Sequence, residues 1–408
     1  MSGKSGMRNS GSGIAAPGGP AARSAAGVAR HVRLGDVAEE VRENWSGPTA
    51  DVPVVGLEHI EPDEIWLRKW EVNPDENTFS KAFRKGQLLF GRRRAYQKKL
   101  SLAPSDGICS GDITVIAAKS DKVVPSLLPF LLRTDKFFDY AIQGSAGSLS
   151  PRVKWAHLAK YEFDMPPMDE QKKLAELLWA ANDLKESYKK AIAATDEMLK
   201  AKFREMFGDT AGNSKKWPMP KFGDSLNGIE NGKSFVCQTV PREGDYPAVL
   251  KLSAVTYGVY QPNENKAVLD ESQYNPKIEV RTGDLLMTRK NTLELVGACA
   301  YVHETTPRLM LPDIVFRLDV KECYDKQFLW ALLSHPDQRR RIQGIAGGTN
   351  TSMVNISKER LCNLPMVVPP LSLQREFVAI ADKAELAKAN LKKSIAAIDQ
   401  VMKGLING

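Results

Sequence analysis

The sequence predicts an α+β fold built by internal tandem duplication: two mixed α/β domains separated by a pair of long antiparallel coiled-coil helices. Three observations support this prediction. Short motifs recur in the same order in both halves of the chain. Each half contains short strand-like runs that end at a Pro-Pro pair, and each pair precedes a long segment of helical periodicity.

The repeated motifs are the first of these observations. They are 33–36 with 221–224, 84–89 with 281–286, 142–147 with 342–347, 166–167 with 369–370, Gln171 with Gln374, and 189–196 with 392–399. The offset between the partners grows from 188 to 203 residues along the chain. A slow drift of this kind is typical of two homologous units whose loops differ in length, so the motifs indicate a duplication.

A long helix follows each strand-rich region. Residues 169–207 and 372–408 carry apolar side chains at spacings of three and four, which is typical of a coiled-coil stripe. We expect the first stripe to begin with Leu174, Leu177, Ala181, Leu184 and Tyr188 and then to shift its phase. The second helix can bury its stripe against the first only by running antiparallel to it, which would place the two domains at opposite ends of a spacer.

These elements set the domain boundaries. Residues 1–30 consist mainly of Gly, Ala and Ser with scattered basic residues, and we expect a disordered N-terminal extension. The first mixed domain then covers 31–168 and the first spacer helix 169–207. The second mixed domain covers 208–371 and the second spacer helix 372–408.

The composition favours a polyanionic partner. Lys and Arg number 57 against 49 Asp and Glu, which gives a formal net charge of +8. The apolar runs fall short of the roughly 20 residues that a membrane helix needs, and the scattered cysteines favour reduced thiols in the cytoplasm. A phosphate-binding loop, an HExxH pair and an Asn/Asp-Pro-Pro-Tyr/Phe motif are all missing, so we expect no catalytic residue, metal or cofactor in this chain.

Basic residues follow a strand-like run at corresponding places in the two halves. The first half carries Arg92, Arg93, Arg94, Lys98 and Lys99, and the second carries Arg289, Lys290 and Asn291. Arginine can donate two hydrogen bonds to guanine, and both kinds of cation neutralise phosphates. We therefore expect these residues to contact DNA, the alternative being a solvated loop.

A second pair of segments combines glycine with polar side chains. The first supplies Ser148, Arg152 and Lys154, and the second supplies Thr349, Asn350, Thr351 and Ser352. Glycine allows a close backbone approach, and the hydroxyl and amide groups can donate hydrogen bonds to DNA, so these residues are further candidates. The alternative is an ordinary turn. Residues 339–341, three arginines, are expected at the polar end of a helix that begins near Asp325.

The repeated plan resembles the specificity (HsdS) subunits of Type I restriction–modification systems. The phrases that carry the resemblance are 86–90 (GQLLF), 163–171 (FDMPPMDEQ), 283–287 (GDLLM) and 364–374 (LPMVVPPLSLQ). Any one phrase is weakly specific, but their order, repetition and spacing together are highly specific. The resemblance extends from about residue 31 to residue 408.

This resemblance implies a non-catalytic, cytoplasmic subunit whose two target-recognition domains read a bipartite, asymmetric site in double-stranded DNA. It also implies partners, namely two methyltransferase (modification) subunits and endonuclease/translocase (restriction) subunits. S-adenosylmethionine, ATP and Mg would belong to those partners, and the target adenine would be flipped out of the duplex. Two alternatives stay open: a free-standing DNA-binding protein, and a coiled-coil adaptor without enzyme partners.

Overall fold

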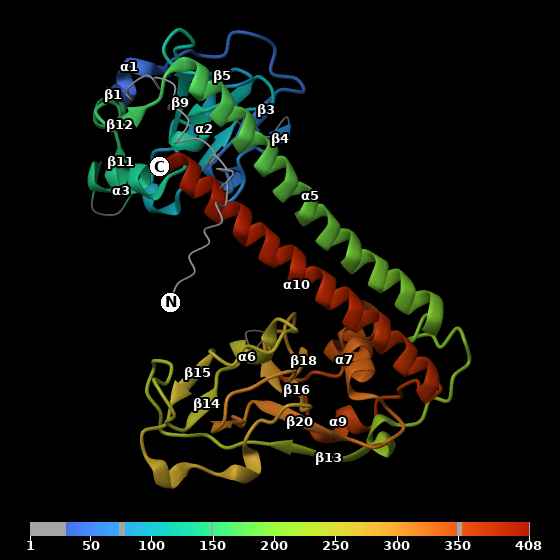
Figure 1. Cartoon of the computed structure of the whole chain (residues 1–408). Helices are drawn as coiled ribbons and strands as arrows, with labels where there is room; N and C mark the ends of the chain where they lie inside the picture. Colours follow the sequence, from blue (N-terminus) through green and yellow to red (C-terminus); the bar gives the residue numbers. More distant parts are fainter. Residues whose placement is uncertain (1–29, 73–77, 148–149, 349–352, 408) are drawn as a thin grey trace, which may run out of the picture. The chain divides into compact units, whose positions relative to one another are not determined.

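The computed structural model describes residues 30–72, 78–147, 150–348 and 353–407, which form helices and short strands in two units (Figure 1). Unit 1 combines the chain up to Glu186 with the segment from Ala396 onward, and unit 2 contains Ser187–Ile395. Each unit therefore includes a part of both long helices. The first strand, β1 (Arg30–Arg33), begins at the last residue of the segment that was predicted to be disordered.

Unit 1 is built on two four-stranded sheets. The first has the order β2-β9-β6-β7, with β2 (Ala38–Val41), β9 (Ile113–Ala118), β6 (Leu88–Gly91) and β7 (Leu100–Leu102), all antiparallel. The second has the order β4-β3-β8-β5, with β4 (Glu71–Val72), β3 (Pro53–Val55), β8 (Gly107–Cys109) and β5 (Lys81–Phe83). Strands β3 and β8 run parallel. The apolar, mostly β-branched start of β9 is buried, as expected for a central strand.

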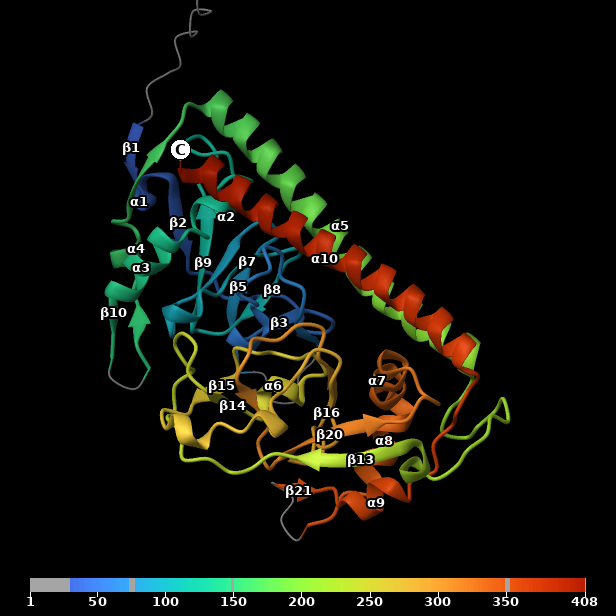
Figure 2. The same cartoon turned by 60° about the horizontal axis from the view of Figure 1, so that its bottom comes forward.

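Shorter elements complete unit 1. Strand β1 pairs with β12 (Glu162–Met165), and β10 (Ser145–Ala146, labelled in Figure 2) pairs with β11 (Arg152–Val153, labelled in Figure 1). The short helices are α1 (Leu34–Val37), α2 (Leu128–Leu131), α3 (Asp135–Gln143) and α4 (Trp155–Leu158). Phe137 and Phe138 of α3 pack on Phe90 of β6, so α3 covers one face of the first sheet.

Unit 2 repeats the order of both sheets, except that its described residues form no strand in the place of β5. Its four-stranded sheet has the order β13-β20-β16-β18, with β13 (Leu226–Asn231), β20 (Val315–Val320), β16 (Leu285–Thr288) and β18 (Cys299–Tyr301). Its second sheet has the order β15-β14-β19, with β15 (Asn265–Ala267), β14 (Ala248–Leu250) and β19 (Leu309–Met310), and β14 and β19 again run parallel. The shared strand order shows that the sequence repeat is a repeat of the fold.

The remaining elements of unit 2 also have counterparts. Strand β17 (Lys290–Asn291) pairs with β21 (Val354–Asn355). The helices are α6 (Ser253–Thr256), α7 (Lys326–Ser334), α8 (Pro336–Gly344) and α9 (Lys358–Cys362). Helix α7 begins next to Asp325, as predicted, and Asp325 caps it. The helix ends at Ser334, however, and the three arginines at 339–341 belong to α8 instead. Pro336 lacks an amide hydrogen and therefore starts a new helix.

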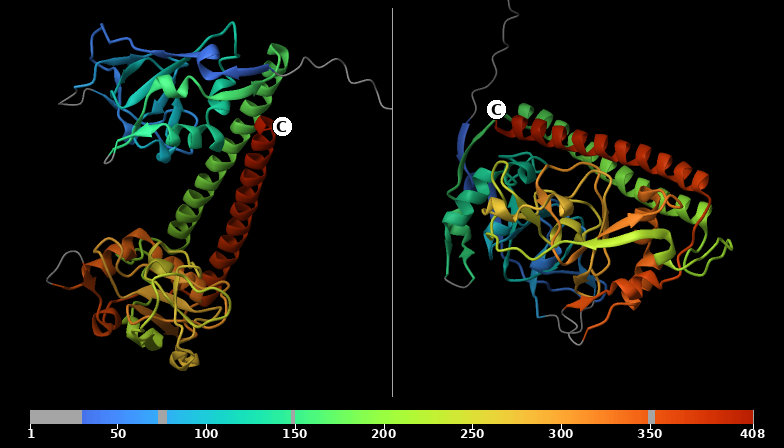
Figure 3. Two further views of the ribbon diagram at one scale, coloured as in Figure 1. Left: turned by 90° about the vertical axis from the view of Figure 1, so that its left-hand side faces the viewer. Right: turned by 90° about the horizontal axis from the view of Figure 1, so that it is seen from below.

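The two long helices are α5 (Met168–Phe207) and α10 (Leu371–Asn407), drawn in green and red in Figure 3. Their terminal turns complete the core of each unit. In unit 1, Leu178 of α5 is fully buried and Met402 of α10 packs on the same cluster. In unit 2, Phe203 and Phe207 of α5 pack against Phe377 of α10.

The stripe that was predicted for the first half of α5 is only partly right: Leu174 packs on the core and Ala181 and Tyr188 are half-buried, but the other two residues are not. Leu177 and Leu184 are exposed, whereas Ala175, Leu178 and Asn182 are buried. The buried face therefore lies one position away from the expected one. Burial by the mixed domain of unit 1, rather than by the second helix alone, selects this face.

Two ion pairs fix the antiparallel register of the helices. In unit 1, the Lys185 Nζ atom lies 2.6 Å from an Asp399 carboxylate oxygen, and in unit 2 the Lys388 Nζ atom lies 2.6 Å from Asp196. Lys185 and Lys388, like Asp196 and Asp399, are related by the 203-residue offset of the duplication, so the same bond is formed twice with the helices exchanged.

A buried glutamine ties the first turn of each long helix to its own domain. The Gln171 side chain accepts a hydrogen bond from the Val124 amide and donates one to the Pro166 carbonyl. The Gln374 side chain accepts from the Asp325 amide and donates to the carbonyls of Cys323 and Pro369. Both glutamines are almost fully buried, so each connects the start of its long helix to the interior of its own domain.

In the described part of the chain, no helix is both long enough and apolar enough to span a membrane.

Candidate DNA-binding surfaces of the two units

In unit 1, the fold brings the two candidate segments of the sequence side by side. The basic residues leave β6 and run next to the strand that follows the glycine-rich loop. Arg93 and Arg152 form an antiparallel bridge, the Arg94 amide donates to the Pro151 carbonyl at 2.9 Å, and the Val153 amide donates to the Arg92 carbonyl at 3.0 Å. Residues separated by almost 60 positions in the sequence therefore share one surface.

Asp112 organises the charges of this surface. One carboxylate oxygen of Asp112 lies 2.7 Å from Arg152 Nε, and the other lies 3.4 Å from Arg93 Nη1. Arg93 also donates to the Ser150 hydroxyl at 2.9 Å. Burial disfavours the ionised carboxylate, but the hydrogen bonds and charges of Arg152 and Arg93 outweigh it and lower the pKa of Asp112. The carboxylate therefore stays ionised and fixes both guanidinium groups.

Unit 2 joins the corresponding segments in the same way. Lys290 and Asn291 of β17 pair with Asn355 and Val354 of β21, and the Ile356 amide donates to the Arg289 carbonyl at 3.0 Å. This last bond is the counterpart of the one between Val153 and Arg92 in unit 1.

The side-chain chemistry of unit 2 is different. Arg289 Nε donates to the Asn355 amide oxygen at 3.1 Å, and the Arg289 guanidinium lies 5.7 Å from the centre of the Phe316 ring. Ile314 stands where unit 1 has Asp112, because its carbonyl accepts from the Arg289 amide as the Asp112 carbonyl accepts from the Arg92 amide. No carboxylate therefore occupies that position of unit 2.

The predicted residues differ in how far they are available to a ligand. Arg94, Arg152 and Lys154 are exposed, while Arg92, Arg93, Arg289 and Lys290 are partly buried. Lys98 Nζ lies 2.6 Å from Asp135, and Lys99 Nζ donates to the Leu57 carbonyl at 2.6 Å. Asn291 is buried and donates to the Thr256 hydroxyl. Lys99 and Asn291 are thus turned into the protein. Five of the predicted residues lie outside the described part of the chain, namely Ser148, Thr349, Asn350, Thr351 and Ser352.

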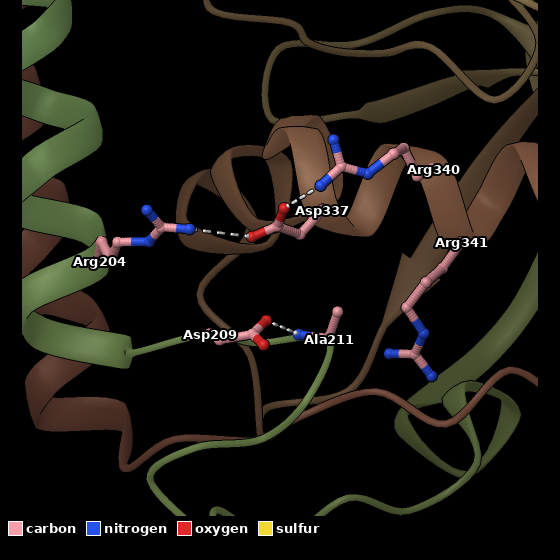
Figure 4. Close-up of a pocket in the computed structure, with 6 residues that line it drawn as sticks. All are labelled: Arg204, Asp209, Ala211, Asp337, Arg340 and Arg341. Carbon is pink, nitrogen blue, oxygen red and sulfur yellow. Dashed lines mark hydrogen bonds and ion pairs between the residues drawn. The ribbon is translucent and has the colours of Figure 1, made fainter.

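The three arginines of α8 have separate surroundings. Arg339 is turned inward and donates to the carbonyls of Val296 and Glu294. Arg340 and Arg341 line a surface pocket together with Arg204, Asp209 and Asp337 (Figure 4). Asp337 lies between two of these arginines, 3.8 Å from Arg204 and 2.5 Å from Arg340. The two carboxylates offset much of the positive charge, so this pocket is a weaker candidate for phosphate than the two surfaces described above.

The sequence did not identify Asp112 as part of the site. Residues 112–116 stood out only as a strand-like run, and nothing in that run indicates which arginines the carboxylate would meet. The sheet order β2-β9-β6-β7 determines which arginines Asp112 contacts. Strands β9 and β6 are antiparallel neighbours, so Asp112, just before β9, and Arg93, just after β6, lie at the same end of the pair. The second half repeats the Asp-Ile pair at 313–314, but the strand register places Ile314, and not Asp313, at the position of Asp112.

Sequence comparison connects the chain to specificity subunits. No protein-family model matches this sequence. Over 165 residues, 40% of the chain, it is 27% identical to the Type I restriction enzyme EcoEI specificity subunit of Escherichia coli, with 28% of that protein covered. Over 172 residues it is 24% identical to the EcoDI specificity subunit of the same organism, covering 40% of this chain and 34% of that protein. The matches thus span about a third of the length of these curated relatives.

Structural comparison covers much more of the chain. A chain from a study of complex assembly and conformational transition in the type I restriction–modification system matches 93% of this chain and 97% of its own length, with a TM-score of 0.55 and 18% identity. The type I S subunit of M. genitalium matches 93% of this chain and 96% of its own length, with a TM-score of 0.55 and 12% identity. These matches confirm the predicted fold class, and the curated relatives confirm the resemblance that the motifs predicted.

Proposed function

We propose that this chain is the DNA sequence-specificity subunit of a Type I restriction–modification complex and that it reads a bipartite, asymmetric site. The observation that carries this proposal is the repeated surface: in each unit, a basic segment is held beside the strand that follows a glycine-rich loop. Similarity to Type I specificity subunits supports the same assignment.

Each surface would read one half-site, with some residues contacting phosphates and others contacting base edges. Exposed cations such as Arg94 and Lys154 neutralise phosphates, which sets affinity and position on the duplex. Arginines held in a fixed direction, such as Arg93 by Asp112, are suited to donate two hydrogen bonds to a guanine edge. The two surfaces differ in side-chain chemistry, because Asp112 and Ser150 bind Arg93 in unit 1 while Asn355 binds Arg289, the counterpart of Arg92, in unit 2. The two half-sites should therefore differ in sequence.

The partners follow from the same assignment. Two methyltransferase subunits and the endonuclease/translocase subunits would assemble with this chain in the cytoplasm and be directed by it to the DNA site. S-adenosylmethionine, ATP and Mg would be bound by those subunits. The role of this chain is then to bind and orient DNA, and we assign no catalytic residue to it.

The test is methyladenine mapping by long-read sequencing, after co-expression of this chain with a Type I methyltransferase subunit with which it forms a complex, in a methylation-free host. We expect modification at one split, asymmetric motif, and none with the methyltransferase alone. A soluble complex with an active methyltransferase that leaves the genome unmodified would contradict the proposal. It would favour a free-standing DNA-binding protein or an adaptor.

A further inference from the structure

The turn that follows the basic segment exposes a large apolar side chain in both units. In unit 1 the tip of this turn is Tyr96, three residues after the bridge at Arg93, with 56% of its surface exposed. In unit 2 the residue three positions after Lys290 is Leu293, with 52% exposed. A single exposed apolar residue needs no explanation, but the same position in two units of different local sequence does.

Both turns are anchored to the protein on the side opposite the exposed tip. In unit 1, Ala95 is buried in the core, and Lys98 is joined to Asp135 of α3. In unit 2, Arg339 and Gln343 of α8 donate to the Glu294 carbonyl, and Arg339 also donates to the Val296 carbonyl. Different side chains thus anchor the same turn while its tip points outward.

The backbone of the first turn is constrained as well. Arg94 and Lys98, which flank Tyr96, both have a positive φ, of 55° and 52°. Non-glycine residues rarely adopt this conformation, and those that do are often found at functional sites. The turn that exposes Tyr96 therefore includes two residues in an unfavourable backbone conformation.

Basic residues precede both tips, and in unit 1 one of them is also exposed. Tyr96 stands next to the exposed Arg94 and close to the bridge between Arg93 and Arg152. Leu293 follows the partly buried Arg289 and Lys290 and precedes the exposed Glu294. Apolar side chains set among cations occur where proteins insert a wedge between base steps or stack on a base. A protein partner would be expected to cover the apolar tip without needing the cations beside it.

We propose that Tyr96 and Leu293 are matched DNA-contacting residues, one for each half-site, that pack against the base stack while the neighbouring arginines hold the phosphates. This inference rests on the proposed function and adds a second kind of contact to it. The two residues differ in shape and polarity, so they would also contribute to the difference between the half-sites.

The experiment measures DNA binding by the complex of this chain with its methyltransferase, on a duplex that carries the motif found by methyladenine mapping. Fluorescence anisotropy at several salt concentrations gives both Kd and its salt dependence. We expect Tyr96→Ala and Leu293→Ala each to weaken binding by about tenfold with an unchanged salt dependence, because no charge is lost. Arg94→Ala should instead reduce the slope of log Kd against log salt by about one.

Conservative and matched variants serve as controls. Tyr96→Phe and Leu293→Met keep an apolar tip and should bind nearly as the unaltered chain does. Tyr246→Ala and Leu269→Ala remove side chains that are exposed to a similar degree elsewhere in unit 2 and should have no effect. The thermal unfolding temperature of every variant should stay unchanged, since the substituted side chains are exposed.

Three outcomes would overturn the inference. Binding within twofold of the unaltered complex for both alanine variants would show that the tips do not touch DNA. Loss of methyltransferase from the complex, with DNA binding intact, would assign the tips to a protein contact. A complex that methylates no motif and binds DNA without preference would remove the proposed function itself, and the mapping experiment detects that separately.

Discussion

Units 1 and 2 hold their long helices with the same polar residues and their candidate DNA-binding turns with different ones. Gln171 and Gln374 occupy equivalent positions and make the same kind of buried connection. At the turns, by contrast, Asp112 holds Arg93 in unit 1, whereas Asn355 holds Arg289 in unit 2. The comparison indicates that the duplicated scaffold was retained while the surface beside it diverged, as two different half-sites would require.

The largest effect is expected from the buried glutamines. Gln374→Ala leaves the Asp325 amide and two carbonyls without partners, and should lower the free energy of unfolding by about 3 kcal/mol. Gln171→Ala removes two bonds and should cost about 2 kcal/mol. Urea-induced unfolding measures both, with Gln261→Ala at an exposed position as the control. Equal, small losses for all three variants would mean that the glutamines do not fix the helices.

The ion pairs between α5 and α10 should come next. Lys388 is only 11% exposed and lies 2.6 Å from both Asp196 and Glu385, whereas Lys185 is 19% exposed and meets Asp399. We expect a loss of about 1.5 kcal/mol for Lys388→Ala and about 1 kcal/mol for Lys185→Ala. The exchanged pair Lys388→Asp with Asp196→Lys should recover part of the loss that either change causes alone. A double variant no more stable than the single ones would exclude a direct interaction.

Acidification should affect the two units in opposite directions. Partial burial lowers the pKa of His335 in unit 2, where its ring stacks on Phe203. The stability that neutral His335 contributes is present above about pH 6.5 and is lost as the pH falls through the lowered pKa. In unit 1, hydrogen bonds to Asp164 and Glu162 raise the pKa of His31. Its contribution is present below about pH 6.5 and is lost as the pH rises through the raised pKa.

Thermal unfolding at pH 5.5 and pH 7.5 distinguishes the two histidines. Relative to the unaltered chain, His335→Gln should gain stability at the lower pH, and His31→Gln should lose a little there. An identical pH dependence in all three proteins would exclude both assignments.

The smallest effect is expected at the charge pair that distinguishes the two surfaces. Asp112→Asn releases Arg93 and Arg152 from their carboxylate, so binding to non-specific DNA should strengthen a few-fold and its salt dependence should steepen by about one. Asn355→Ala, which releases Arg289 in unit 2, removes no charge and should leave the salt dependence unchanged. Electrophoretic mobility shifts across a salt series measure both. If both variants showed the same dependence of DNA affinity on salt, the carboxylate that unit 1 has and unit 2 lacks at this position would have no electrostatic effect on binding.

The sequence by itself determined the duplication, the two long helices and the segments that carry basic and glycine-rich motifs, because spacing and periodicity are local properties that survive in the chain. Only the tertiary structure decided which face of α5 is buried. Leu178 is buried and Leu177 exposed because the mixed domain covers that side of the helix.

The tertiary structure also decided the chemistry of the candidate surfaces. Sheet order brings Asp112 to Arg93 and Arg152, and it turns Lys99 and Asn291 away from solvent. Contacts of this kind join segments that are far apart in the chain. A strand-like pattern predicts on which face of the sheet a side chain lies, but it does not predict which residue of a distant segment that side chain contacts.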